Sequence, residues 1–135
     1  MQEELLAFLI DDDLDDQEFF AMVIEETYPS IQYTFATDGV QALEKLNENP
    51  SFVPNIILID VNMPRMNGVD CLIEIKKLPR LRESHIYMYS TSADPSIVEL
   101  CITLGACGYI KKETTTEALQ KRFSEVISKL KIPSL

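Results

Sequence analysis

Polar side chains follow four of the short apolar runs in this chain, each at the point where the run ends. They are Asp11, Asp12 and Asp13 after the first run, Asp60 after the second, Ser90 after the third, and Lys111 and Lys112 after the fourth. Carboxylate oxygens are hard ligands of the kind that Mg²⁺ prefers. An ammonium and a hydroxyl beside them favour a second anionic group, most simply a phosphoryl group. These residue types therefore predict a magnesium site at which phosphoryl groups are handled.

The acids at 11–16 have a simpler alternative interpretation, a solvated first turn of a helix, where negative charge is favourable against the helix dipole. We give that simpler role to Asp15 and Asp16. Asp11 and Asp12 differ because they directly end a fully apolar run. Three carboxylates held close together without a cation would repel one another and raise their pKa values, so a cluster of this kind implies a bound cation.

Asp60 also has a simpler alternative, as a helix cap or a loop acid, and lysines that follow strands are usually solvated. The apolar run before Asp60 stops abruptly, however, and Pro64 and Gly68 mark a turn after it. The combination of residue types at four strand ends carries the interpretation, rather than any one residue.

Short apolar runs alternate with longer amphipathic stretches along the chain. Runs apolar at every position are typical of parallel strands covered on both faces, and the alternation at 31–35 is typical of a half-exposed edge strand. We predict strands at 5–10, 31–35, 55–59, 86–89 and 108–110, and helices at 14–28, 39–47, 69–78, 94–105 and 115–130. Five strand–helix repeats predict one doubly wound α/β domain, a five-stranded parallel sheet with helices on both faces. Ligands of such a fold bind beyond the carboxyl ends of the strands, where the polar side chains would meet.

The charge balance of the chain excludes several classes of partner. Its 135 residues carry 12 Lys and Arg against 22 Asp and Glu, a formal net charge of −10. Nucleic acid and anionic lipid both require positive charge, so we expect neither as a partner. No apolar stretch approaches the ~20 residues of a membrane span, and the acidic start at 1–4 does not resemble a signal peptide. With 46% hydrophobic residues the chain can bury a core, and its length suits a single domain.

The cysteines and the histidine show no pattern of a metal or disulfide site. Cys71, Cys101 and Cys107 form no Cys-x-x-Cys pair, and His85 is the only histidine, so a zinc site is not expected. Three scattered cysteines are also too few for a disulfide framework. We interpret all three as small apolar residues buried on helices and expect a reducing, cytoplasmic location.

Several separated motifs, in order along nearly the whole chain, resemble the receiver domains of two-component response regulators. Leu9-Ile10-Asp11-Asp12-Asp13 resembles the family's aliphatic run that ends in an acidic pair. The segment from Leu58 to Gly68 resembles its phospho-acceptor strand and Met-Pro-x-x-x-Gly loop, and Gly105-Ala106-Cys107-Gly108-Tyr109 resembles its Gly-Ala-x-x-Tyr/Phe segment. The resemblance implies a flavodoxin-like (βα)5 fold with strand order 2-1-3-4-5.

The resemblance also implies roles for the matching residues. Asp60 would be the nucleophile that takes a phosphoryl group from a phosphohistidine. Ser90 lies thirty residues after it, where the family has Thr or Ser, and Lys112 lies fifty-two residues after it, where the family has a lysine. Lys112 would pair with one phosphoryl oxygen, and Ser90 would donate a hydrogen bond to another. Tyr109 would be an aromatic switch that swings inward as Ser90 moves.

A set of ligands for Mg²⁺ follows from the same resemblance. Asp12 and Asp60 would bind the ion directly, together with the backbone carbonyl of Asn62, and Asp11 would act through water. A phosphoryl group adds negative charge to a pocket that is already acidic. The phosphorylated state would be strongly disfavoured without Mg²⁺ and Lys112, so we expect the chemistry to need both.

The segment after Lys112 departs from the family pattern. The family usually has proline there, often after a cis bond, whereas this chain has Glu113. A cis bond between non-proline residues costs ~2.5–4 kcal/mol, so the sequence leaves the geometry of this bond open. Lys111 is adjacent, but strand alternation would point it to the other face, and the spacing favours Lys112.

These inferences predict a stand-alone receiver domain over residues 1–135 with no separate output domain, since only 131–135 follow the last predicted helix. It would be a signalling switch in a phosphorelay rather than an enzyme with a separate substrate, although it would catalyse its own phosphorylation and dephosphorylation. The expected partners are a histidine kinase or a histidine phosphotransfer protein, and an unidentified downstream protein. The family implies that the downstream protein binds the face formed by the fourth and fifth helices and the last strand.

Two other classes of protein share parts of this pattern. A Mg²⁺-dependent phosphatase with an aspartate nucleophile usually has a second acid two positions later for acid–base catalysis, where this chain has Asn62, and no insertion here is large enough for a cap domain. A flavodoxin-like electron carrier needs a phosphate-cradling loop after the first strand, where this chain has aspartates. Both alternatives therefore rank below the receiver domain.

Overall fold

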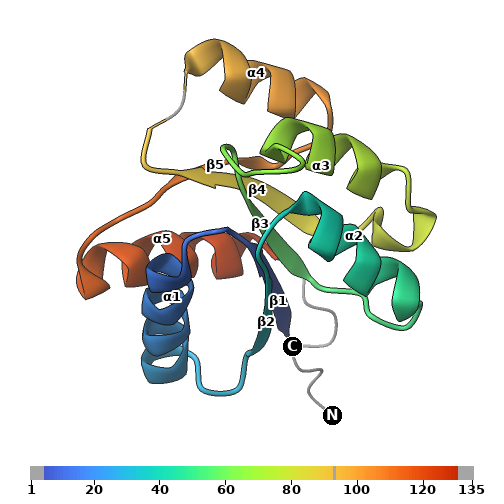
Figure 1. The fold of residues 1–135 in the computed structure, drawn as a ribbon. Coiled ribbons are helices and arrows are strands. Elements are labelled where there is room, and N and C mark those ends of the chain that lie inside the picture. Colours follow the sequence, from blue (N-terminus) through green and yellow to red (C-terminus); the bar gives the residue numbers. More distant parts are fainter. Residues whose placement is uncertain (1–4, 93, 131–135) are drawn as a thin grey trace.

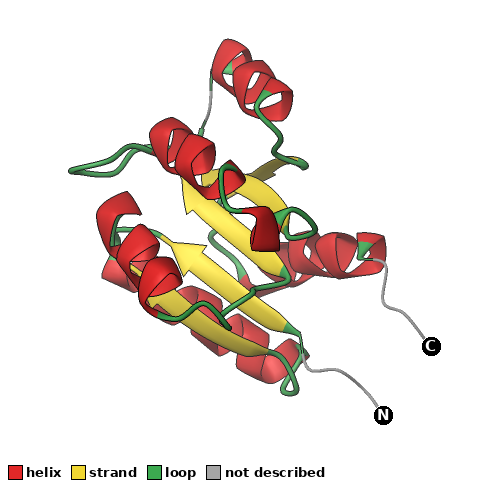
Figure 2. Cartoon of the chain, turned by 90° about the vertical axis from the view of Figure 1, so that its right-hand side faces the viewer, coloured by secondary structure: helices red, strands yellow, loops and turns green. Residues whose placement is uncertain are grey.

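A computed structural model of the chain describes residues 5–92 and 94–130, so the acidic start at 1–4 and the segment 131–135 lie outside the described residues. The strands are β1 (Leu6–Ile10), β2 (Gln32–Ala36), β3 (Ile56–Asp60), β4 (His85–Ser90) and β5 (Gly108–Lys111). The helices are α1 (Leu14–Thr27), α2 (Gly39–Glu48), α3 (Gly68–Lys76), the 3₁₀ helix η1 (Pro79–Leu81), α4 (Pro95–Thr103) and α5 (Thr116–Lys129). The strands form a parallel sheet in the order β2-β1-β3-β4-β5, with helices on both faces (Figure 1 and Figure 2). The predicted fold class and strand order are confirmed.

The central strands of the sheet are covered by helices on both faces. Every residue of β3 is buried, and so is β1 after its first residue. β2 lies at one edge and is mostly half-exposed, as its alternating pattern predicts. The register aligns Ile10 with Ile59, and Asp60 with Tyr89, so the carboxyl ends of β1, β3 and β4 lie side by side.

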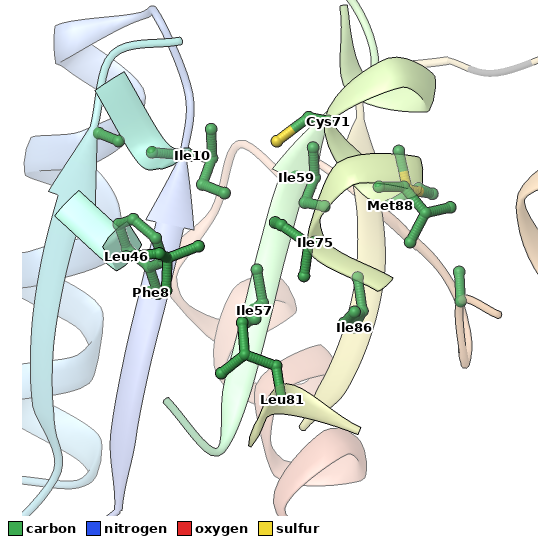
Figure 3. Close-up of a cluster of buried hydrophobic side chains, with 14 of the residues drawn as sticks. Phe8, Ile10, Leu46, Ile57, Ile59, Cys71, Ile75, Leu81, Ile86 and Met88 are labelled. Atoms are coloured by element: carbon green, nitrogen blue, oxygen red, sulfur yellow. The ribbon is translucent and has the colours of Figure 1, made fainter. Parts of the chain in front are cut away.

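Two buried clusters, one on each face of the sheet, hold the helices in place. On one face, Ile57 and Ile59 of β3 pack in a cluster that includes Leu46 of α2 (Figure 3). On the other face, the alternate side chains of the strands pack against α1 and α5, where Phe20 and Phe123 meet edge to face with 5.6 Å between ring centroids. The alternation of strand side chains between faces therefore divides each apolar run between two cores.

The predicted helix at 69–78 corresponds to α3, which ends two residues earlier than predicted. α3 ends at Lys76, and η1 follows it. Leu78 precedes Pro79 and has an extended backbone, which is the conformation that a residue before proline prefers. The α-helix therefore stops before the proline, and all the predicted strands and helices agree with the structure to within two residues at each end.

The three cysteines are all free. Cys71 and Cys101 are buried on helices, as predicted, but the prediction for Cys107 is wrong because its side chain is exposed. Cys107 lies just before β5, outside any helix, beside the buried Ala106.

None of the helices in the described ranges has the length and apolar character that a membrane span requires.

Candidate functional site

The carboxyl edge of the sheet brings together three of the predicted site residues. Asp11 follows β1 directly, Asp12 is the next residue, and Asp60 is the last residue of β3. One carboxylate oxygen from each lies within 4.8 Å of the other two. Asp11 is fully buried and Asp60 is 7% exposed, whereas Asp12 is open to solvent. The pocket therefore concentrates three acids from two neighbouring strands.

Lys112 supplies positive charge to this acidic pocket. Its Nζ lies 2.9 Å from Asp11 Oδ2 and 3.2 Å from Asp60 Oδ2, and 5.4 Å from the centre of the Tyr89 ring. The side chain of Lys112 is only 10% exposed, while that of Lys111 is exposed. The structure thus places Lys112, rather than Lys111, in the pocket, as strand alternation predicts.

The shortest contact of Lys112 is to an acid for which the sequence suggested only a solvated role. Asp16 Oδ2 lies 2.7 Å from Lys112 Nζ, so that interpretation of Asp16 is wrong, while Asp15 is exposed as predicted. Asp13 caps the helix by accepting the N–H groups of Asp15 at 2.9 Å and Asp16 at 3.3 Å. This cap starts α1 immediately after the end of β1, which brings Asp16 of its first turn to the pocket.

Gln17 is a second residue of α1 that supports the pocket and that motif reasoning missed. Its side-chain amide donates a hydrogen bond of 2.8 Å to the backbone carbonyl of Asp11, and the side chain is buried. A signal was available, because Gln17 lies three residues before Phe20 and seven before Ile24, on the same buried face of the helix. A polar residue in such a stripe needs a buried partner, and here that partner is the end of β1.

Burial and mutual repulsion set the charge state of the pocket. The pKa of Asp11 is raised to about 6, chiefly because the carboxyl group is buried and further because Asp60 is close, although Lys112 opposes the rise. The pKa of Asp12 is raised for the same two reasons. Burial acts to lower the pKa of Lys112, but the carboxylates of Asp16 and Asp11 outweigh burial and raise it above its ordinary value. The lysine therefore stays charged at neutral pH, and Asp11 and Asp12 ionise at a cost in free energy.

The donor atoms of the pocket fit a hard divalent cation such as Mg²⁺. Oδ2 of Asp11 is buried and accepts no well-directed hydrogen bond, although Lys112 Nζ lies near it. A buried oxygen in that state is unfavourable, and a water molecule bound to a cation would satisfy it. The converging ligand atoms are carboxylate oxygens, which suit Mg²⁺ better than a soft metal. Asp12 lies at the open side of the pocket, where water, which Mg²⁺ usually retains, has access.

The loop after Asp60 closes tightly against the end of β3. The N–H of Asn62 donates to Asp60 Oδ1 at 3.2 Å, and the N–H of Gly68 donates to the carbonyl of Val61 at 2.9 Å. A Cβ at Gly68 would collide with the backbone oxygen of Asp60 and would lie 2.8 Å from Val61 Cα. The glycine of the Met-Pro-x-x-x-Gly segment therefore permits a close backbone approach. The assignment of the Asn62 carbonyl as a metal ligand stays a prediction.

Ser90 and Tyr109 lie beside the pocket and are linked to each other. Ser90 is buried and donates from Oγ to the backbone carbonyl of Ser92 at 2.7 Å. The hydroxyl of the half-buried Tyr109 donates to the backbone carbonyl of Ser90 at 3.0 Å, and the N–H of Lys112 donates to the same carbonyl at 2.8 Å. One carbonyl at the end of β4 therefore contacts both the predicted switch tyrosine and the pocket lysine.

The peptide bond between Lys112 and Glu113, which the sequence left open, is trans, as are the other peptide bonds in the described ranges. Glu113 accepts a hydrogen bond from Nε of Arg122 at 3.2 Å. Where the family usually has proline, this chain therefore has an acid that forms an ion pair with α5.

Comparisons with known proteins agree with this arrangement. The family model of the response regulator receiver domain matches residues 7–124. The chemotaxis protein CheY1 of Helicobacter pylori is 29% identical over 117 residues, which cover 84% of this chain and 93% of that protein. The phosphorylated cyanobacterial phytochrome response regulator RcpA has a similar structure, with a TM-score of 0.84 and 23% identity over 98% of this chain and all of that one. The Mn²⁺-bound form of response regulator Rcp1 has a TM-score of 0.81 and 24% identity, over 96% of this chain and 99% of that one.

The family match covers the acids after β1, the end of β3, Ser90 and Lys112. It favours the receiver interpretation over both the aspartate-nucleophile phosphatase and the flavodoxin-like electron carrier, and the two solved structures support the fold. The family model matches residues 7–124 of the 135-residue chain. The chain therefore belongs to the response regulator receiver domain family of two-component signal transduction.

Proposed function

We propose that this receiver domain is a phospho-acceptor switch in which Asp60 takes a phosphoryl group from the phosphohistidine of a histidine kinase or a histidine phosphotransfer protein. The observation that carries the proposal is the position of Asp60 at the end of a central strand, with Oδ2 3.2 Å from Lys112 Nζ and beside the oxygens of Asp11 and Asp12. A carboxylate oxygen of Asp60 attacks phosphorus, the P–N bond breaks, and the imidazole leaves with the bonding electrons. The product is an acyl phosphate on Asp60.

Mg²⁺ is the proposed cofactor. The carboxylates of Asp12 and Asp60 and the backbone carbonyl of Asn62 would hold the ion, and Asp11 would act through water. When bound, the ion neutralises charge that develops on the phosphoryl oxygens. The converging carboxylates of this chain support the proposal, as does the Mn²⁺-bound form of the related fold in Rcp1.

Lys112 is the residue that pairs with the phosphoryl group. Without that group, its ammonium contacts Asp11, Asp16 and Asp60. An acyl phosphate on Asp60 carries about −1.5 to −2 charge in place of the −1 of the carboxylate, and it therefore competes well against the single charge of Asp16. Lys112 transfers part of its hydrogen bonding to a phosphoryl oxygen, and Asp16 is released.

Ser90 and Tyr109 carry the change away from the pocket. Ser90 Oγ donates to the carbonyl of Ser92 in the structure, and after phosphorylation it donates to a phosphoryl oxygen instead. This exchange moves the loop after β4. Tyr109 responds because its hydroxyl is bound to the Ser90 carbonyl, so a local change of charge biases a two-state element.

The face formed by α4, β5 and α5 is the proposed binding site of the downstream protein. A groove of about 350 Å³ is lined there by residues of β4, β5 and α5 that include Tyr109, Lys111 and Arg122. Leu100 and Ile102 of α4 are 43% and 50% exposed. Tyr109 lines the groove and also contacts the end of β4, so it couples the pocket to this face.

The proposal also covers how the chain is organised into domains and where in the cell it acts. The chain acts as a single receiver domain in the cytoplasm and catalyses its own phosphorylation and dephosphorylation without a separate substrate. The pocket supports self-catalysis, because one chain contributes both the nucleophile and the ammonium that stabilises the transferred group.

Intact-mass measurement after treatment with acetyl phosphate and Mg²⁺ tests the proposal. We expect one phosphoryl adduct on the unchanged protein and none on Asp60→Asn. Asp70→Asn is the matched control, because it removes an exposed acid from the first turn of α3 and should keep the adduct. An unmodified protein that nevertheless binds Mg²⁺ would contradict the proposal, and so would an adduct that survives Asp60→Asn. Transfer from a phosphorylated histidine phosphotransfer protein tests the class of donor.

A further inference from the structure

Two loops at the carboxyl edge of the sheet are joined by one bidentate ion pair, in which an arginine donates two hydrogen bonds to a carboxylate. Arg65 lies between β3 and α3, and Asp38 lies between β2 and α2. Nε of Arg65 donates to Asp38 Oδ2 at 2.9 Å, and Nη2 donates to Asp38 Oδ1 at 3.0 Å. A bidentate pair of this kind fixes the relative orientation of the guanidinium and the carboxylate as well as the distance between them.

Asp38 is a rigid anchor for this pair. Its carboxylate is buried and caps α2 by accepting the N–H of Gln41 at 2.8 Å. Burial acts to raise the pKa of Asp38, but the hydrogen bonds from Gln41 and Arg65 outweigh burial and hold the pKa below its ordinary value. The anchor is therefore an ionised carboxylate, fixed at the start of a helix.

Arg65 and Met66 hold the loop after β3 in an unusual conformation. The φ of Arg65 is 64°, in the left-handed region that non-glycine residues rarely occupy and that persists only where the surroundings fix it. Met66 packs so closely on Gly39 that a Cβ there would lie 2.9 Å from its Cγ and Sδ. Residues 65–66 are thus fixed against residues 38–39 by an ion pair and by packing.

The fixed loop is also the one that carries Asn62. At its other end, Gly68 closes against the backbone of Asp60 and Val61. Both ends of the segment 61–67 are therefore held, one by the strand that ends at the pocket and the other by the start of α2.

We propose that the Arg65–Asp38 pair is a positioning device for the metal site, which holds the backbone carbonyl of Asn62 in place as a ligand. Within the described residues, neither side chain forms a hydrogen bond or an ion pair with Asp11, Asp12 or Asp60, so both act through the loop. This inference rests on the proposed function, because the carbonyl of Asn62 is a ligand only if the pocket binds Mg²⁺.

A purely electrostatic role for the pair makes a different prediction. Arg65 adds positive charge at the acidic edge of the sheet, and Asp38 adds negative charge. If charge alone mattered, Arg65→Ala would strengthen Mg²⁺ binding and Asp38→Asn would weaken it. Positioning predicts that both substitutions weaken binding, so the sign of the Arg65→Ala effect separates the two roles.

Isothermal titration calorimetry with MgCl₂ at fixed ionic strength measures this sign. We expect about tenfold weaker binding for each single variant, a size typical of lost support for a metal ligand, and no further weakening in the double variant, because the two residues act as one unit. Asp38→Asn keeps a good helix cap. Lys77→Ala is the matched control, since it removes an exposed lysine that pairs with Glu74 at 2.8 Å at the C-terminal end of α3. Melting temperatures in EDTA establish that each variant is folded.

Three outcomes distinguish the possibilities. If Arg65→Ala binds Mg²⁺ as tightly as the unchanged protein, or more tightly, the positioning role is overturned. If the unchanged protein binds Mg²⁺ and neither variant differs from it, only this inference fails. If the unchanged protein binds no Mg²⁺, the proposed function fails and the inference fails with it.

Discussion

Two adjacent residues of β3 have opposite surroundings. Ile59 is fully buried in the apolar cluster between β3 and the helices α2 and α3 (Figure 3), whereas Asp60 is almost as deeply buried among other acids. The same step occurs on β1, where Ile10 is followed by the buried Asp11. Burial stabilises the isoleucines, because it removes apolar surface from water, and it costs free energy for the carboxylates.

The difference shows how one sheet supports both stability and chemistry. The apolar clusters hold the strands in register, and the strand ends then hold acids closer together than they would stay in solution. Groups held in unfavourable surroundings, such as these buried acids, are typical of functional sites, which break the rules of burial that the rest of the protein follows. We therefore expect the core to be indifferent to Mg²⁺ and pH, and the pocket to respond to both.

The largest expected effect is on the core side of this comparison. Ile57→Ala removes a fully buried side chain from β3 and should lower the free energy of unfolding by ~2–5 kcal/mol. The loss should be equal with and without Mg²⁺, because packing does not depend on the ion. Urea unfolding measures it, with Val53→Ala as the control, since Val53 is 43% exposed. A loss that Mg²⁺ abolishes would break the comparison.

On the pocket side, removal of a charge should stabilise the protein. In EDTA at pH 7, Asp11→Asn should raise the free energy of unfolding by ~1–2 kcal/mol. The folded pKa of about 6 stands against an ordinary value of 3.8, each unit corresponds to about 1.4 kcal/mol, and the lost partner of Lys112 offsets part of the gain. Asp15→Asn, at an exposed position, should change little. A destabilised Asp11→Asn would show that pairing with Lys112 outweighs burial.

The same substitution predicts the sign of the pH dependence. Folded Asp11 holds its proton more tightly than the unfolded chain does, so its contribution to stability is fully present below pH 3.8 and is lost as pH rises through about 6. Without Mg²⁺, the stability gain of Asp11→Asn over the unchanged protein should therefore grow between pH 4 and pH 7. Urea unfolding across this range checks it, and a gain that is constant with pH would be the contrary result.

The sequence alone identifies the strand ends well because one local pattern specifies them. An apolar run that stops at an acid marks a buried strand and also the position of its carboxyl end. For this reason the pattern finds Asp11 and Asp60 together with β1 and β3. The helices follow from their apolar periodicity, and their predicted limits agree with the structure to within two residues.

Contacts between distant segments are not contained in local patterns. Asp16 and Lys112 are 96 residues apart, and Asp38 and Arg65 are 27 apart. Local periodicity treats each of these as a surface charge, and only the arrangement of loops along one edge of the sheet decides which opposite charges meet. Cys107 shows the same limit, because its exposure depends on how the segment before β5 lies on the sheet.

Mg²⁺ itself should have an effect of intermediate size. The ion should raise the melting temperature of the protein, since a ligand at ten times its dissociation constant stabilises by about 1.4 kcal/mol. Asp12→Ala should abolish most of this response, and Asp15→Asn should keep it. Differential scanning calorimetry measures both, and a melting temperature that is unchanged across millimolar Mg²⁺ would exclude the metal site.

The smallest expected effect concerns Asp16. Because Asp16 competes with the phosphoryl group for Lys112, Asp16→Asn should speed uptake from acetyl phosphate by at most about fivefold, given that partly exposed ion pairs contribute ~0.2–1 kcal/mol. A time course of intact mass measures the rate, with Asp15→Asn as the control. Slower uptake would show instead that Asp16 positions Lys112 for the reaction.

The most direct test of the central claim is to locate the phosphoryl group. Protein treated with acetyl phosphate and Mg²⁺ is reduced with borohydride, which converts the acyl phosphate of an aspartate to homoserine, and is then sequenced by tandem mass spectrometry. We predict homoserine in place of Asp60 and an unmodified Asp11, Asp12 and Ser90. Homoserine in place of Asp11 or Asp12, or a phosphate on Ser90, would contradict the assignment of Asp60 as the acceptor.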